Sequence, residues 1–74
     1  MAEQKVREVF AASVRRERQA RGWSREELAG RSGVGKGTIV NVELLRTGTT
    51  LHVASLLAGA LGTTIGELAG DGRG

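Results

Sequence analysis

The chain has 74 residues and a formal net charge of +3 at pH 7, and its lack of cysteine excludes both a disulfide framework and a cysteine-based metal site. A chain of this length forms one small domain with a limited core, and the absence of proline favours packed helices. No apolar run reaches membrane-spanning length and the N-terminus lacks a signal-peptide pattern, so we expect a cytoplasmic protein with no membrane partner.

The first predicted helix covers residues 3–21. Val6, Phe10 and Val14 recur at every fourth position, as the core-facing side chains of a helix do. Gly22 ends this pattern. The sequence therefore begins with a long amphipathic helix.

The next two predicted helices cover residues 24–31 and 35–46. Ser24 and Glu27 have the spacing of a capping box, in which two side-chain oxygens satisfy backbone N–H groups at the start of a helix. Gly33 suits the left-handed backbone that ends a helix and turns the chain sharply. Together these signals predict a helix-turn-helix, the motif whose second helix enters the major groove of DNA.

Two shorter helices are predicted over residues 51–61 and 64–69. Thr50 is placed to cap the first of them, and Leu51 begins a series of apolar residues at helical spacing. A second capping box starts the other helix. The sequence thus predicts an all-α chain of five helices.

The chain resembles the lambda-repressor and Cro type of helix-turn-helix, the xenobiotic-response-element family, in the stretches VRRERQARGWSREELAGRSGVGKGTIVNVE and TTLHVASLLAGALGTTIGELAG. The resemblance covers roughly residues 10–68. It implies a five-helix, lambda-repressor-like DNA-binding domain over residues 1–69. Residues 70–74 would then be a flexible tail, or a truncated linker to a sensing domain in a longer chain.

The function that the resemblance implies is sequence-specific binding of double-stranded DNA by a transcriptional regulator. The recognition helix, residues 35–46, would lie in the major groove, and two copies would bind an inverted repeat as a homodimer. The charge distribution agrees, because residues 1–21 carry six Lys or Arg against three Glu, whereas residues 49–74 carry one against two. A merely solvated basic face is the alternative.

The resemblance places base-reading positions at Lys36, Gly37 and Asn41. A lysine can reach base edges or phosphates, and an asparagine amide can pair with N6 and N7 of adenine. Gly37 has no side chain with which to read a base, so readout is sparse unless the glycine allows the backbone to approach DNA closely. An ordinary surface lysine and an exposed asparagine are the competing interpretations.

Four residues are candidates for contacts to DNA phosphates: Arg25, Thr38, Arg46 and Thr47. Arg25 lies in the first turn of a predicted helix, where a cation opposes the helix dipole, and this suggests an external anion. The Thr38 hydroxyl can instead bond back to a helix carbonyl. The other two can be ordinary loop residues.

The family pairs an arginine of its first helix with a glutamate of the recognition helix. The matching residues here are Arg18 and Glu43, so we expect a partly buried salt bridge with a structural role. After this glutamate the family commonly has a polar residue and a glycine, whereas this chain has Leu44 and Leu45. We therefore expect the helix to continue toward Arg46.

Val40, Leu44 and Leu45 are apolar but lie away from the predicted core stripe. They would need a cover, such as thymine methyl groups, a second subunit or another protein. The alternative function is therefore a protein-interaction module with the same fold, or an antitoxin-like partner, with weak or no specific DNA reading.

Nothing in the sequence indicates an enzyme, a cofactor or a metal. The segment GRSGVGK has the spacing of a phosphate-binding loop, but Gly37 follows where Ser or Thr is needed and no strand precedes it. His52 is the single histidine and has no cysteine with which to share a metal. No nucleophile and base pair is apparent, so no catalytic residue is predicted.

Overall fold

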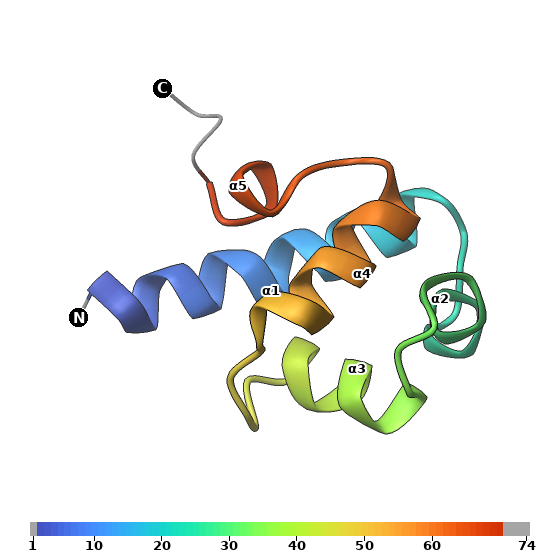
Figure 1. Cartoon of the computed structure of the whole chain (residues 1–74), viewed down its shortest axis with the longest axis horizontal. Coiled ribbons are helices and arrows are strands. Elements are labelled where there is room, and N and C mark those ends of the chain that lie inside the picture. The colour runs from blue at the N-terminus through green and yellow to red at the C-terminus, as the bar shows by residue number, and fades with distance from the viewer. Residues whose placement is uncertain (1, 71–74) are drawn as a thin grey trace.

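A computed structural model describes residues 2–70 of the chain (Figure 1). Within this range the helices are α1 (Ala2–Ala20), α2 (Arg25–Ser32), α3 (Lys36–Glu43), α4 (Leu51–Leu61) and α5 (Ile65–Leu68). The described residues contain no strand, and the predicted all-α, five-helix fold is confirmed. Of the tail predicted over residues 70–74, residues 71–74 lie outside the described residues.

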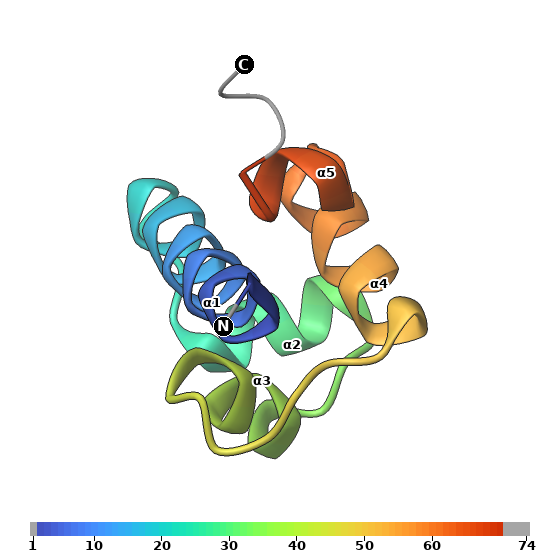
Figure 2. The ribbon, with the colours of Figure 1, turned by 90° about the vertical axis from the view of Figure 1, so that its left-hand side faces the viewer.

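The long helix α1 crosses the molecule, and the shorter helices pack around it (Figure 1). α3 packs on both α1 and α2, and α4 packs on α1, α2 and α5. Two perpendicular views place α3 at one edge of the molecule and α5 at the opposite edge (Figure 2). One side of α3 therefore faces the core and the other side faces solvent.

Apolar side chains from all five helices and from the turn before α3 form one core. Its buried members are Phe10, Val14, Leu28, Val34, Ile39, Val42, Ala54, Leu57, Ala58, Leu61 and Leu68. Leu28, Ile39 and Leu57 are fully buried, and each contributes about 1.5–3 kcal/mol by leaving water. Because these three come from α2, α3 and α4, the helix-turn-helix is held on α4.

Two residues of the predicted apolar series lie outside this core. Val6 of α1 is 47% exposed and Leu51 of α4 is 78% exposed. Both lie near the start of their helix, and α1 alone is about 28 Å long at 1.5 Å per residue. Its first turns therefore extend past the core.

Local cap chemistry sets the helix ends. The Ser24 Oγ accepts a hydrogen bond from the Glu27 N–H at 3.0 Å, and the Thr50 Oγ1 accepts one from the Val53 N–H at 3.1 Å. Gly33 ends α2 in the left-handed conformation, with φ 79°. The sequence predicted these caps, but only the serine half of the capping box at Ser24 is present, because the Glu27 carboxylate pairs with Arg31.

The end of the recognition helix differs from the prediction. α3 ends at Glu43, with Leu44 as its C-cap, and does not continue to residue 46. The chain turns because Leu45 adopts the left-handed conformation, with φ 60°. The prediction was wrong because a leucine gives no sequence signal for a conformation in which its Cβ is crowded.

Backbone hydrogen bonds hold this turn in place. The Leu45 N–H donates to the Val42 carbonyl at 3.2 Å, and the Arg46 N–H donates to the Asn41 carbonyl at 2.8 Å. This pair of bonds is the Schellman motif, in which the left-handed residue is usually glycine. The motif satisfies the last carbonyls of α3 and directs the following loop across the molecule toward α4.

Candidate nucleic-acid interface

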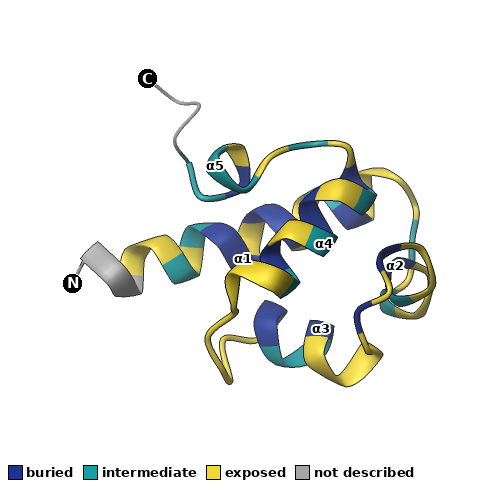
Figure 3. Cartoon of the chain, in the orientation of Figure 1, coloured by how far each residue is buried: buried dark blue, intermediate teal, exposed yellow. Residues whose placement is uncertain are grey.

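The outward side of α3 is accessible along its first turn (Figure 3). Lys36, Gly37 and Thr38 are exposed, whereas Val40 and Asn41 are half-buried. All three predicted base-reading positions therefore reach solvent, with Asn41 less accessible than the other two. A Cβ added at Gly37 would meet no atom within 4 Å, so there is open space at this position.

The start of α3 has a positive electrostatic character. The N-cap is Gly35, which has no side chain to accept a hydrogen bond from the first turn. The first turn also contains no acidic residue. The first N–H groups of a helix lack acceptors within the helix and, together with the dipole, attract anions. Lys36 adds a full charge at the same place. This end of α3 is therefore suited to a polyanion.

Glu43, the last residue of α3, is fully buried between two arginines. Arg18 Nε donates to its Oε2 at 2.8 Å and Arg18 Nη2 donates to its Oε1 at 3.1 Å. Arg25 Nε donates to Oε1 at 2.9 Å, and Arg18 Nη1 donates to the Trp23 carbonyl at 2.8 Å. The predicted pair of Arg18 and Glu43 is present, and the cluster connects α1, α2 and α3.

The contact between Arg25 and Glu43 was missed by the sequence analysis. Arg25 in the first turn of α2 opposes the helix dipole, and this signal did point to an anion. We expected a DNA phosphate, but Glu43 supplies a carboxylate from within the domain. The Arg25 side chain remains 32% exposed, and only its Nε takes part in this pair. Its Nη1 and Nη2 atoms therefore lie near the end of α3 and outside this ion pair.

The loop after α3 carries the other two phosphate candidates. Arg46 and Thr47 are exposed, and within residues 5–70 Arg46 forms no ion pair. The position of Arg46 is set by the hydrogen bond from its N–H to the Asn41 carbonyl. The candidates are thus spread along the recognition helix, with Thr38 in its first turn and Arg25 and this loop near its end.

Arg21, by contrast, is committed to the fold. Its Nη1 donates to the Glu17 carboxylate at 2.8 Å, and its Nη2 donates to the Leu61 carbonyl at 2.6 Å. The hydrogen bond from Arg21 lowers the pKa of the Glu17 carboxyl below its usual value. This arginine joins the ends of α1 and α4, so it adds little to a DNA-binding surface.

Leu44 and Leu45 form an apolar surface beside these polar groups. Leu44 is 44% exposed and Leu45 is 38% exposed. Val40 is half-buried, so it contributes less of this surface than its helical position suggested. The end of the recognition helix therefore combines exposed leucines with the buried ionic cluster.

In the part of the chain that the structure describes, there is no phosphate-binding loop, no cluster of metal ligands and no membrane-spanning helix. GRSGVGK spans the end of α2, the turn and the first residue of α3, and does not follow a strand as a phosphate-binding loop does. Among residues 5–70 no three His, Asp or Glu gather as metal ligands. No described helix combines the length and the apolar character needed to cross a membrane.

A family model described as Helix-turn-helix, HTH_3, matches residues 14–68. The chain belongs to this family. The match covers α2, α3, α4, α5 and the end of α1, and the resemblance to the lambda-repressor type is confirmed. The chain is therefore a helix-turn-helix DNA-binding domain, from a family that is typically non-enzymatic.

A solved structure is also similar to this helix-turn-helix domain. It is the crystal structure of a hypothetical transcription factor, NHTF, from Neisseria, with 34% sequence identity and a TM-score of 0.84. The similarity covers 96% of this chain and 84% of that chain. No curated protein matches. The domain thus resembles a transcription factor in both sequence and fold.

Proposed function

We propose that this helix-turn-helix domain binds a specific sequence in double-stranded DNA and regulates transcription, with α3 in the major groove. The observation that carries the proposal is the accessible, positively charged start of α3, in a helix whose other end is held by a buried ionic cluster. Lys36 and Asn41 would read base edges through their side chains. Gly37 would let the α3 backbone approach the DNA closely.

Phosphate contacts on both sides of the groove would hold α3 in register. Arg25, Thr38, Arg46 and Thr47 would make these contacts. Arg25 is well prepared for this role, because Glu43 already fixes its Nε and thereby limits the freedom of the guanidinium. Its outer nitrogens would then donate to a phosphate at little further cost in side-chain entropy.

We further propose that two copies bind an inverted repeat as a homodimer. A single DNA-binding module buries only about 600–1,000 Å² of its surface, so useful specificity normally requires two half-sites. Leu44 and Leu45, with Val40 beside them, offer an apolar surface at the end of α3 for contact between the copies. Their exposure in the single chain supports this interpretation.

The same exposed leucines support a second candidate function. In that case the domain would be a protein-interaction module, or an antitoxin-like partner, and Leu44 would contact another protein. The two functions are separated by paired variants. Replacing both Lys36 and Asn41 by alanine would abolish specific DNA binding and leave partner binding intact, whereas Leu44→Glu would abolish partner binding and leave the reading of a single half-site intact.

The test of the main proposal is selection of bound sequences from random duplex DNA at two salt concentrations. We expect an enriched inverted repeat and an affinity that falls steeply as salt rises, because bound phosphates release counterions. The double variant at Lys36 and Asn41 should lose the enrichment. Lys5→Ala, which removes an exposed charge from α1, is the control and should retain it. Binding without any enriched sequence would contradict the proposal.

A further inference from the structure

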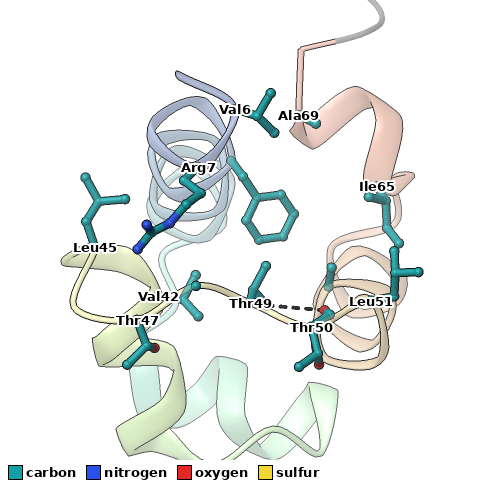
Figure 4. Close-up of a pocket in the computed structure, with 13 residues that line it drawn as sticks. Val6, Arg7, Val42, Leu45, Thr47, Thr49, Thr50, Leu51, Ile65 and Ala69 are labelled. Carbon is teal, nitrogen blue, oxygen red and sulfur yellow. Dashed lines mark hydrogen bonds between the residues drawn. The ribbon is translucent and has the colours of Figure 1, made fainter. Parts of the chain in front are cut away.

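A groove opens beside the DNA-binding surface, between α1, α5 and the loop that joins α3 to α4 (Figure 4). Its volume of about 460 Å³ lies within the range of small-molecule sites in proteins. Phe10 of α1, Ala54 of α4 and Ile65 of α5 contribute to its apolar wall. Of its lining residues, only Thr47 is also a proposed DNA contact.

The rim of this groove exposes apolar side chains to water. Val6, 47% exposed, and Leu51, 78% exposed, both line it. Leu45, whose backbone is in the left-handed conformation, lines the same groove. An apolar group placed between these side chains would remove their exposed surface from water. Because that burial is favourable, the bound group would be stabilised.

Arg7 is the one charged residue in the lining of the groove, which includes no Asp or Glu. Its Nε is shielded from solvent and has no hydrogen-bond partner among the described residues. The side chain extends from α1 toward Val42 and Leu45 (Figure 4). A donor buried without an acceptor is costly, and an anionic oxygen at this edge would satisfy it.

We propose that this groove binds a small free carboxylic acid with an apolar chain. The chain lies against Phe10, Ile65 and Leu51, and the carboxylate meets Arg7 beside Gly48. A second copy of the domain is the less suitable occupant, since a two-fold contact groove to groove brings two Arg7 side chains together with no acidic lining residue to pair with them.

The test is an NMR titration of the domain with decanoate, and with decanol as the uncharged probe of the same chain. We expect saturable shifts at the backbone amides of Gly48, Ala54 and Ile65. Decanoate should bind at least about tenfold more tightly than decanol, because only the acid accepts a charge-assisted hydrogen bond. Equal affinities for the two probes, or shifts spread over the surface, would overturn the proposal.

Variants of Arg7 make the test specific. Arg7→Met should weaken decanoate about tenfold, to the level of decanol, and Arg7→Glu should transfer the preference to decylammonium. Lys5→Met removes an exposed charge from the same helix outside the groove and should leave the affinity unchanged. A dimer in which the groove amides do not respond to decanoate would show that a second copy is the occupant. The titration contains no DNA, so its outcome is independent of the proposed DNA binding.

Discussion

Glu43 shows how a single residue sets the geometry of the recognition helix. Its carboxylate is removed from water, and that cost is offset by three hydrogen bonds from two arginines on two other helices. A buried ionic cluster of this kind is often no more stabilising than an apolar replacement of the same shape. The cluster instead fixes the orientation of α3, because these hydrogen bonds can form only when α3 lies at one angle to α1 and α2.

Removing the Glu43 charge should be far more costly than removing an exposed one. Glu43→Gln leaves two arginines without their anion and should destabilise the domain by about 3–5 kcal/mol, measured by urea denaturation. Glu27→Gln is the matched control. Its pair with Arg31 is as short, at 2.7 Å, but half-exposed, and its loss should cost less than about 1 kcal/mol. Equal losses for the two variants would contradict the structural role of Glu43.

Leu45 has a backbone conformation that its residue type disfavours. With φ 60° and a side chain 38% exposed, Leu45→Gly should raise the free energy of unfolding by about 0.5–1 kcal/mol, because relief of the crowded Cβ exceeds the lost packing. Leu44→Gly should lower it, since Leu44 has φ −94° and needs no glycine. Thermal unfolding followed by circular dichroism measures both. A less stable Leu45→Gly would mean that packing of this leucine in the groove outweighs the strain.

At the scale of elements, cap residues and helical periodicity were sufficient to predict five helices. The caps at Ser24 and Thr50 act locally, so the sequence carries their signal. The end of α3 could not be predicted from residue types, because a leucine does not indicate a left-handed backbone conformation. The family pattern did contain the signal, in the glycine that commonly stands where this chain has Leu45.

Some features of the candidate site could likewise be predicted from the sequence, and others could not. The exposure of Lys36 and Gly37 follows from helical geometry, which the sequence determines locally. The partner of Arg25 could not be predicted, because Glu43 lies 18 residues away and their contact depends on how α2 meets α3. The groove at Arg7 was also missed, since α1, α5 and the loop after α3 come together only in the folded chain.

Gly37 offers a test of close approach between α3 and DNA. Gly37→Ala should stabilise the domain by about 0.5–1 kcal/mol, because the site lies inside a helix with open space around it. It should at the same time weaken specific DNA binding, since the methyl group would occupy the space left for a base edge. Gly59→Ala in α4 is the control, with an equally open Cβ site. It should give a similar gain in stability and unchanged DNA affinity, as measured by fluorescence anisotropy. Unchanged affinity for Gly37→Ala would remove this glycine from the proposed interface.

At the scale of the whole molecule, size limits how the domain meets DNA. Its longest dimension is 31 Å, and each copy carries one recognition helix. Successive major grooves on one side of a duplex are about 34 Å apart, so one copy cannot occupy two of them. The modest net charge of +3 also limits the attraction that a single copy can generate. Tight and specific binding is therefore expected to require two copies.

The spacing between half-sites should consequently control affinity. Inserting about five base pairs into the selected inverted repeat rotates one half-site by half a helical turn and places the two copies on opposite faces of the duplex. Inserting about ten base pairs restores the face but adds about 34 Å, more than the length of the domain. The contact through Leu44 and Leu45 is short, so both insertions should abolish cooperative binding in a gel-shift titration. Both duplexes should then bind as weakly as one carrying a single half-site. If the insertions left affinity and cooperativity unchanged, the copies would bind independently and the proposed homodimer would be wrong, whereas specific reading by α3 would still stand.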